Sequence, residues 1–172
     1  PLIVATFVAI HRHYSQLERS IALPPGDGAV ELRHTVVVLV GRLNRGVPVA
    51  VAYARSLHPE HLVAVTVTTD DVDTDQVRAE WAAHRFGVPL DIVESPYRDL
   101  TDPVMGYLDE LDARWDDDTI TVIIPEVVVH RWYHHLLHNQ SALALKARLL
   151  YRDNTVVTSV PWHYDPDAAE DV

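Results

Sequence analysis

The stretch VVVLVGRLNRGVPVAVAYA, from Val36 to Ala54, decides the fold class. It begins as a run of β-branched residues, which favours a strand covered on both faces of a sheet. A short turn runs from Gly41 to Gly46, and apolar residues then recur at helical spacing. A strand, a glycine-bounded turn and a helix form the front half of the nucleotide site in many α/β proteins. The stretch therefore predicts an α/β fold with a candidate phosphate-binding turn.

The same alternation continues along the chain. Strands are expected at residues 35–40, 62–68, 90–93, 119–124 and 155–160, and helices at 46–57, 72–85, 100–114 and 132–150. Pro125 and Pro161 are expected to end the last two strands. Short apolar strands separated by helices predict a five-stranded parallel sheet, of order 3-2-1-4-5. Ligands bind such sheets beyond the carboxyl ends of the strands, here residues 41–46 and the segment from Pro125 onward.

Composition excludes several classes of protein. The chain has 172 residues, of which 48% are hydrophobic, enough for one packed domain and an extension. It has no cysteine, which excludes disulfides and thiolate chemistry. Its net charge of −11 argues against a nucleic-acid partner. The acidic excess falls in residues 61–172, with twenty-one acidic and eight basic residues, and predicts a solvated surface.

The chain begins with PLIVATFVAI, ten residues without a charge, followed by a segment that contains Arg12 and Arg19. The run is shorter than the roughly 20 residues that span a bilayer. An apolar run that leads into basic residues is typical of a membrane helix leaving on the cytoplasmic side. A buried N-terminal helix or strand fits the same run equally well.

The turn GRLNRG is neither a GxGxxG sequence nor a P-loop. Arg42 and Arg45 place two positive charges where a bound anion would lie, beside a helix N-terminus. Asn44 could cap that helix or form hydrogen bonds with a base or ribose. An ordinary turn with two solvated arginines is the alternative, and the sequence leaves both open.

A histidine-rich segment follows the fourth strand. His130, His134 and His138 are spaced four residues apart and would share one face of a helix. No HExxH sequence, cysteine or suitably spaced carboxylate completes a metal site, so no metal is predicted. Ser141 is interpreted as the cap of the helix that follows. No nucleophile, Ser-His-Asp set or carboxylate pair supports an enzyme.

Four segments together resemble the cytoplasmic C-terminal domain of bacterial APC-superfamily permeases, a group that includes KimA-type potassium importers. They are VGRLNRG, ESPYRDL, the stretch ITVIIPEVVVHRWYHHLLHNQSALALKARLL and VVTSVPWH. The resemblance implies a universal-stress-protein-like fold that dimerises. It also implies a domain plan: the end of the last membrane helix and a basic arm at 1–22, a linker at 23–32, the α/β domain at 33–163 and an acidic tail at 164–172.

The resemblance also implies a function. KimA-type importers are inhibited by cyclic di-AMP, which binds their cytosolic domain, so an adenine nucleotide at a homodimer is expected to control transport from the cytoplasmic face of the cell membrane. ATP-binding universal stress proteins carry a glycine-rich loop after strand four, but here that segment has no glycine, and only Ser141 fits the pattern. The expected ligand residues are Arg42, Asn44 and Arg45, with His134, His138 and Ser141. A structural dimerisation module of the permease without a ligand is the alternative.

Overall fold

The computed structural model describes residues 2–21, 33–68, 72–95, 99–115, 119–128 and 140–163. The chain divides into two compact units, residues 1–31 and 32–172. The first contains α1 (Leu2–Ile21), which exposes the apolar side chains of Ile3, Val4 and Phe7. Among the described residues, no helix combines the length and the apolar character that crossing a bilayer requires.

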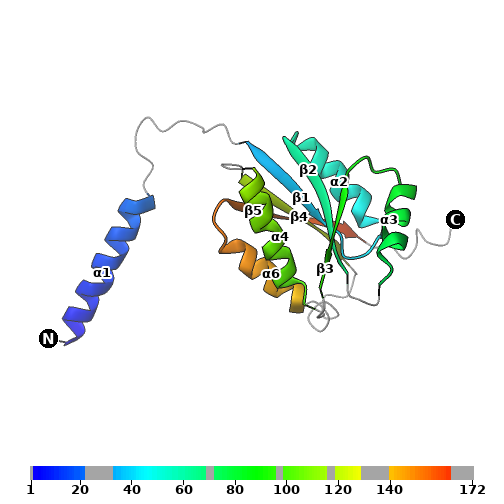
Figure 1. Cartoon of the computed structure of the whole chain (residues 1–172). Coiled ribbons are helices and arrows are strands. Elements are labelled where there is room, and N and C mark those ends of the chain that lie inside the picture. Colours follow the sequence, from blue (N-terminus) through cyan, green and yellow to red (C-terminus); the bar gives the residue numbers. More distant parts are fainter. Residues whose placement is uncertain are drawn as a thin grey trace. The chain divides into compact units, whose positions relative to one another are not determined.

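The second unit is built on a sheet of five parallel strands in the order β3-β2-β1-β4-β5 (Figure 1), which confirms the predicted fold class. The strands are β1 (His34–Leu39), β2 (His61–Thr68), β3 (Leu90–Glu94), β4 (Thr119–Val128) and β5 (Thr155–His163). β1 lies at the centre, where Val38 pairs with Ala64 of β2 and with Ile123 of β4. A strand with neighbours on both sides and helices on both faces must be apolar throughout, which explains the unbroken valine run.

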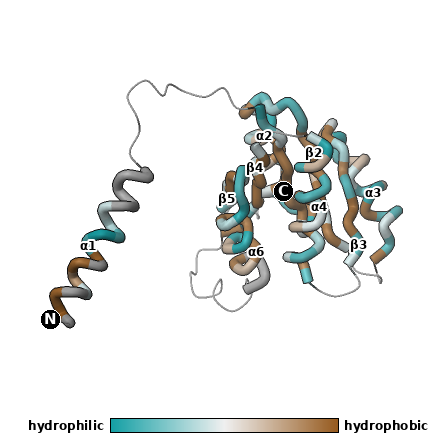
Figure 2. The backbone as a smooth tube through the Cα atoms, turned by 60° about the vertical axis from the view of Figure 1, so that its left-hand side comes forward, coloured by the Kyte–Doolittle hydropathy of each residue, from teal (hydrophilic) through white to brown (hydrophobic). Residues whose placement is uncertain are grey.

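Helices cover both faces of the sheet (Figure 1). They are α2 (Gly46–Ser56), α3 (Thr74–Ala83), α4 (Thr101–Arg114) and α6 (Gln140–Leu150). Side chains of a strand alternate between faces, so Val36 and Val38 pack in a core with α2 and α3, whereas Val37 packs in a second core with α4 and α6. Figure 2 shows apolar stretches running along the strands between these helices.

Two strands are longer than predicted. Pro125 and Pro161 do not end β4 and β5, which continue to Val128 and His163. In this part of the sheet, residues 124–128 of β4 pair with residues 159–163 of β5. Proline lacks an N–H and is tolerated where no neighbouring strand requires one. The β1 pairing of β4 stops at Ile123, and β5 is the outermost strand, so each proline has a side without a partner strand.

The observed helix boundaries differ less from the predicted ones than the ends of these two strands do. The helix predicted at 132–150 is described only as α6, from Gln140, and residues 129–139 lie outside the described residues. Because α6 begins at Gln140, Ser141 is the second residue of the helix rather than its cap. At α3, the cap is Asp73, whose Oδ1 accepts hydrogen bonds from the backbone N–H groups of Asp75 and Gln76.

A hydrogen bond joins α4 to the outer strand β3. The Tyr107 hydroxyl donates to Asp91 Oδ2 at 2.6 Å. Burial raises the pKa of the Tyr107 phenol well above its ordinary value, and the bond to the Asp91 carboxylate raises it further. The phenol therefore stays protonated at neutral pH and fixes α4 against the edge of the sheet.

Candidate functional site

The turn between β1 and α2 is closed by Asn44. Its Oδ1 accepts a hydrogen bond from the Gly46 backbone N–H at 2.8 Å, and its Nδ2 donates to the Arg42 carbonyl oxygen at 3.1 Å. Both ends of the Asn44 amide thus stabilise the turn. Of the two roles that the sequence predicted for Asn44, these contacts favour the capping role. A side chain held in this way presents fewer free groups to a base or ribose.

The two glycines of the turn differ in their surroundings. A Cβ on Gly46 would lie 3.0 Å from Asn44 Oδ1 and 3.4 Å from Trp162 Cβ, so this position requires a close approach. Gly41 has no positive φ and nothing within 4 Å of an added Cβ. The turn therefore does not require glycine at position 41, because its backbone angles suit other residues.

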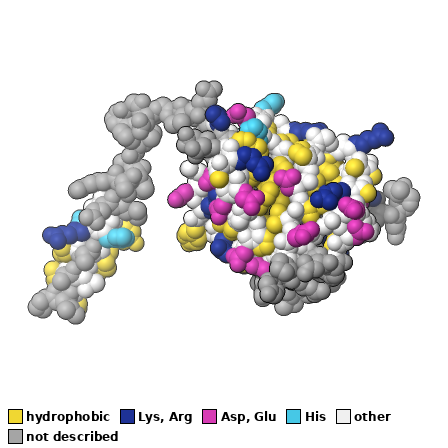
Figure 3. Space-filling model, in the orientation of Figure 1, with side chains coloured by type: hydrophobic (Ala, Val, Ile, Leu, Met, Phe, Trp, Pro, Cys, Tyr) yellow, Lys and Arg dark blue, Asp and Glu magenta, His cyan; other side chains and the backbone are white. Residues whose placement is uncertain are grey.

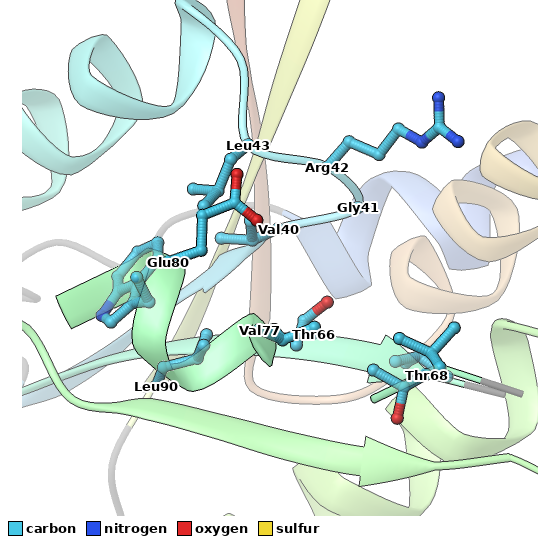
Figure 4. Close-up of a pocket in the computed structure, with 12 residues that line it drawn as sticks. Val40, Gly41, Arg42, Leu43, Thr66, Thr68, Val77, Glu80 and Leu90 are labelled. Carbon is cyan, nitrogen blue, oxygen red and sulfur yellow. The ribbon is translucent and has the colours of Figure 1, made fainter. Parts of the chain in front are cut away.

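A pocket of about 470 Å³ opens between this turn, β2 and α3 (Figure 4). Its lining comes from the β1–α2 turn, β2, β3 and α3, and from the residues next to β1 and α3. The lining residues are Val40, Gly41, Arg42, Leu43, Thr66, Val67, Thr68, Val72, Val77, Glu80, Trp81 and Leu90. It includes three residues of the predicted turn, Gly41 to Leu43. It lies at the carboxyl edge of the parallel strands, on the β2–β3 side of β1 rather than between β1 and β4, where the strand order reverses.

The wall of the pocket comes from one face of α3. Val77, Glu80 and Trp81 are three and four residues apart, so they project from the same side of the helix. Trp81 is 7% exposed, and its Nε1 donates to the Val88 carbonyl oxygen at 2.9 Å. Its ring packs against Phe86, with 4.5 Å between centroids. These contacts hold the wall in place.

The floor of the pocket carries two hydroxyl groups. Thr66 and Thr68 follow Ala64 on the same side of β2, beyond the part of the sheet that α2 and α3 fill. Thr68 is 5% exposed, and its Oγ1 has no hydrogen-bond partner among the described residues. An unpaired buried hydroxyl is costly, so this floor offers a ligand a polar contact.

Asn44 and Arg45 line a second, smaller hollow of about 290 Å³. The hollow is bounded on the α3 side by His84 and Phe86, whose rings stack at 5.4 Å. Arg42 lines the large pocket and Arg45 the small one. The two arginines that the sequence paired thus line different cavities.

Of the remaining predicted ligand residues, the structure describes only Ser141, which does not line the pocket. Ser141 lies in the first turn of α6, which packs on the opposite face of the sheet from α3. His134 and His138 lie outside the described residues. Within the described part of the chain, no three His, Asp or Glu side chains come together as metal ligands would.

Sequence reasoning missed the threonines and Glu80. The signal for the threonines lies in the sequence LVAVTVT of β2, where one alternate row changes from Ala64 to Thr66 and Thr68. A row that changes from apolar to hydroxyl side chains marks the place where the core ends. No comparable signal exists for Glu80, because its position depends on how α3 packs.

The doubly wound sheet of parallel strands with helices on both faces defines an open, Rossmann-like α/β domain. Residues 32–162 match the family described as the KimA potassium transporter C-terminal domain, and the chain belongs to this family. It is 28% identical over 167 residues to potassium transporter KimA of Bacillus subtilis (strain 168). The match covers 95% of this chain and 27% of that protein, so the chain spans about a quarter of the relative's length.

Proposed function

We propose that this chain is the regulatory domain of a potassium transporter, held at the cytoplasmic face of the cell membrane, and that it binds an adenine nucleotide to control transport. Cyclic di-AMP is the first candidate, because the sequence resembles the domains through which KimA-type importers respond to it. The observation that carries the proposal is the pocket at the carboxyl edge of the sheet, with Arg42 at its rim. Its role is binding rather than catalysis.

The pocket suits one base and one phosphate. A volume of about 470 Å³ lies within the range of roughly 300–1,000 Å³ that is usual for small-molecule sites. Apolar walls and two hydroxyl groups fit a base and a sugar, and the Arg42 guanidinium fits a phosphate. The segment after β4 contains no glycine, whereas a cradle of backbone N–H groups for a triphosphate is typically glycine-rich. Each pocket would thus hold half of a cyclic dinucleotide.

A homodimer is part of the proposal. β5 is the outermost strand, and unprotected edges favour pairing with another chain. Four large apolar side chains are exposed on α6, the turn after it and β5: Leu143, Leu150, Tyr151 and Val156. We call them the α6–β5 patch. Exposed apolar side chains along a sheet edge suit a second copy of the chain, related by a twofold axis.

The N-terminal unit would connect the domain to the membrane. The exposed apolar side chains of α1 precede Arg12, the order expected where a helix leaves the bilayer on the cytoplasmic side. In this plan residues 1–22 continue from the last membrane helix and residues 23–32 form a linker to the α/β domain at 33–163. Residues 164–172 form an acidic tail.

Calorimetric titration of the chain with cyclic di-AMP, ATP and AMP tests the proposal. We expect cyclic di-AMP to bind more tightly than ATP, because the segment after β4 lacks the glycines of a typical triphosphate loop. The stoichiometry separates two arrangements: one ligand per two chains means that a cyclic dinucleotide bridges two pockets, and one per chain means that each pocket binds its own. If none of the three nucleotides binds, the regulatory proposal is wrong.

A structural dimerisation module is the second candidate function, and the α6–β5 patch favours it independently of the pocket. In this case the domain assembles the transporter without a small ligand. A chain that forms a stable dimer by light scattering but releases no heat with any nucleotide would support this candidate over the first.

A further inference from the structure

The large pocket has opposite charges at its two ends. Glu80 and Leu43 lie at one end in Figure 4, where the Glu80 carboxylate is turned toward the β1–α2 turn. Arg42 and Thr68 lie at the other side of the view, and the Arg42 side chain extends away from Glu80. Among the described residues, neither Glu80 nor Arg42 takes part in an ion pair.

These charges impose an orientation on an anionic ligand. A phosphate beside the Glu80 carboxylate would meet a like charge, whereas a phosphate beside Arg42 would meet an opposite one. The phosphate therefore belongs at the Arg42 end. What lies at the Glu80 end must be neutral and must carry N–H or O–H groups, because an ionised carboxylate only accepts hydrogen bonds.

Apolar side chains also line the pocket near Glu80. They include Trp81, which is the next residue of α3, together with Leu43 and Leu90. The Trp81 indole N–H is already bonded to Val88, so this wall offers an apolar surface rather than a donor. A base that lies against it would present its polar edge to Glu80.

Resting on the proposed function, we infer that Glu80 is the specificity-determining residue of the pocket. Its carboxylate accepts a hydrogen bond from the exocyclic amino group of a nucleobase, while Arg42 holds the phosphate of the same nucleotide. The pocket thereby selects bases that carry an amino group over bases that lack one. An analogue without the amino group cannot form this hydrogen bond to the carboxylate, so it binds less tightly.

The test compares AMP with purine riboside 5′-monophosphate, which lacks only the amino group of the base. Binding to the chain is measured by NMR titration, for the wild type and for Glu80→Ala. A hydrogen bond to a charged group corresponds to roughly tenfold or more in affinity. We expect the wild type to prefer AMP about tenfold, and Glu80→Ala to weaken AMP by about the same factor and abolish the preference.

Asp75→Asn is the matched control. Asp75 is an acidic residue on the same helix, paired with Arg78 and outside both cavities. It should leave both affinities unchanged. Because Glu80 and Asp75 are exposed, neither substitution should change folding by more than about twofold in the unfolding equilibrium. Where AMP binds too weakly to measure, the affinity of the same variants for cyclic di-AMP decides, with the same tenfold loss expected for Glu80→Ala only.

Three results would overturn the inference. First, unchanged affinities in Glu80→Ala would show that Glu80 plays no part in selecting the base. Second, tighter binding by Glu80→Ala would show that the phosphate lies beside the Glu80 carboxylate. If the wild type binds AMP or cyclic di-AMP without discriminating the amino group, only this inference fails. If it binds neither nucleotide, the proposed function fails with it.

Discussion

The backbone N–H of Gly46, the first residue of α2, donates a hydrogen bond to Asn44 Oδ1 at 2.8 Å, one residue ahead of the Arg45 cap position. It satisfies one of the N–H groups that a helix leaves unpaired at its first turn. It also fixes the chain between Arg42 and Arg45, whose side chains then line two different cavities. The side chain of Asn44 therefore stabilises the turn quoted at the outset, and in the proposed function the phosphate contact is assigned to Arg42.

Asn44→Ala removes this cap. We expect the free energy of unfolding to fall by about 0.5–2 kcal/mol, the usual cost of losing a side-chain cap. Urea unfolding followed by circular dichroism measures the change. Asn44→Asp keeps the acceptor oxygen and should remain within about 0.5 kcal/mol of the wild type, because both residues cap well. An alanine variant as stable as the wild type would show that the bond contributes nothing.

Arg42→Ala should weaken binding of cyclic di-AMP by at least about tenfold, because a charge-assisted contact contributes roughly 1.5–3 kcal/mol. Arg45→Ala should change it by less than about threefold, since Arg45 lines the smaller hollow. Calorimetric titration measures both. Arg78→Ala, on the exposed surface of α3, is the control for lost positive charge. A larger effect from Arg45 than from Arg42 would move the phosphate to the other cavity.

Leu143→Glu with Leu150→Glu should weaken dimerisation by at least about tenfold. The two side chains are 69% and 74% exposed and lie seven residues apart on one face of α6. Charging them disfavours burial in an interface but costs the folded monomer little. Sedimentation over a range of concentrations measures the change.

The control for the dimer variants is Val49→Glu, which places a charge at a residue 43% exposed on α2, on the opposite face of the sheet from α6. It should leave the dimer intact. A wild-type chain that remains monomeric at high concentration would remove the dimer from the account, whatever the variants do.

Tyr107→Phe should lower the free energy of unfolding by about 1–2 kcal/mol at neutral pH, because Asp91 loses its phenol partner. The contact also depends on pH. An unfolded tyrosine ionises near pH 10, and burial raises the pKa of Tyr107 in the folded chain above that value. Its contribution is therefore complete below about pH 10 and is lost as the pH rises further.

Unfolding at pH 8, 9.5 and 11 for the wild type and Tyr107→Phe measures this dependence. The difference between the two proteins should shrink at the highest pH. A constant difference would mean that ionisation of the phenol is not coupled to folding.

The arrangement of the sheet could be predicted from the apolar sequence of β1 and from the alternation of strands and helices. An unbroken run such as Val36–Val40 suits only a strand covered on both faces, and alternation with helices fixes parallel neighbours. The ends of β4 and β5 could not be predicted, because whether a proline ends a strand depends on its neighbours. Pro125 lies beyond the pairing with β1, which the sequence alone does not reveal.

Only the part of the site that lies within one short stretch of the sequence could be predicted. Gly41 and Arg42 follow directly from the strand–turn–helix pattern. Glu80 could not be predicted, because it is a surface residue of α3 that becomes part of a wall only through the packing of Trp81 against the sheet. Arg42 and Arg45 were expected to bind one anion because they are close in the sequence. Asn44 lies between them and forms hydrogen bonds within the turn, and the two arginines line different cavities.

The most direct test of the central claim, that a nucleotide occupies the pocket between the β1–α2 turn, β2 and α3, is to follow the backbone amide signals of the isotope-labelled chain by NMR while cyclic di-AMP is added. The account predicts that the largest shifts fall on Gly41, Arg42, Thr68 and Glu80, all of which line the pocket. Largest shifts confined to β5 and α6, or no shifts at saturating nucleotide, would contradict it.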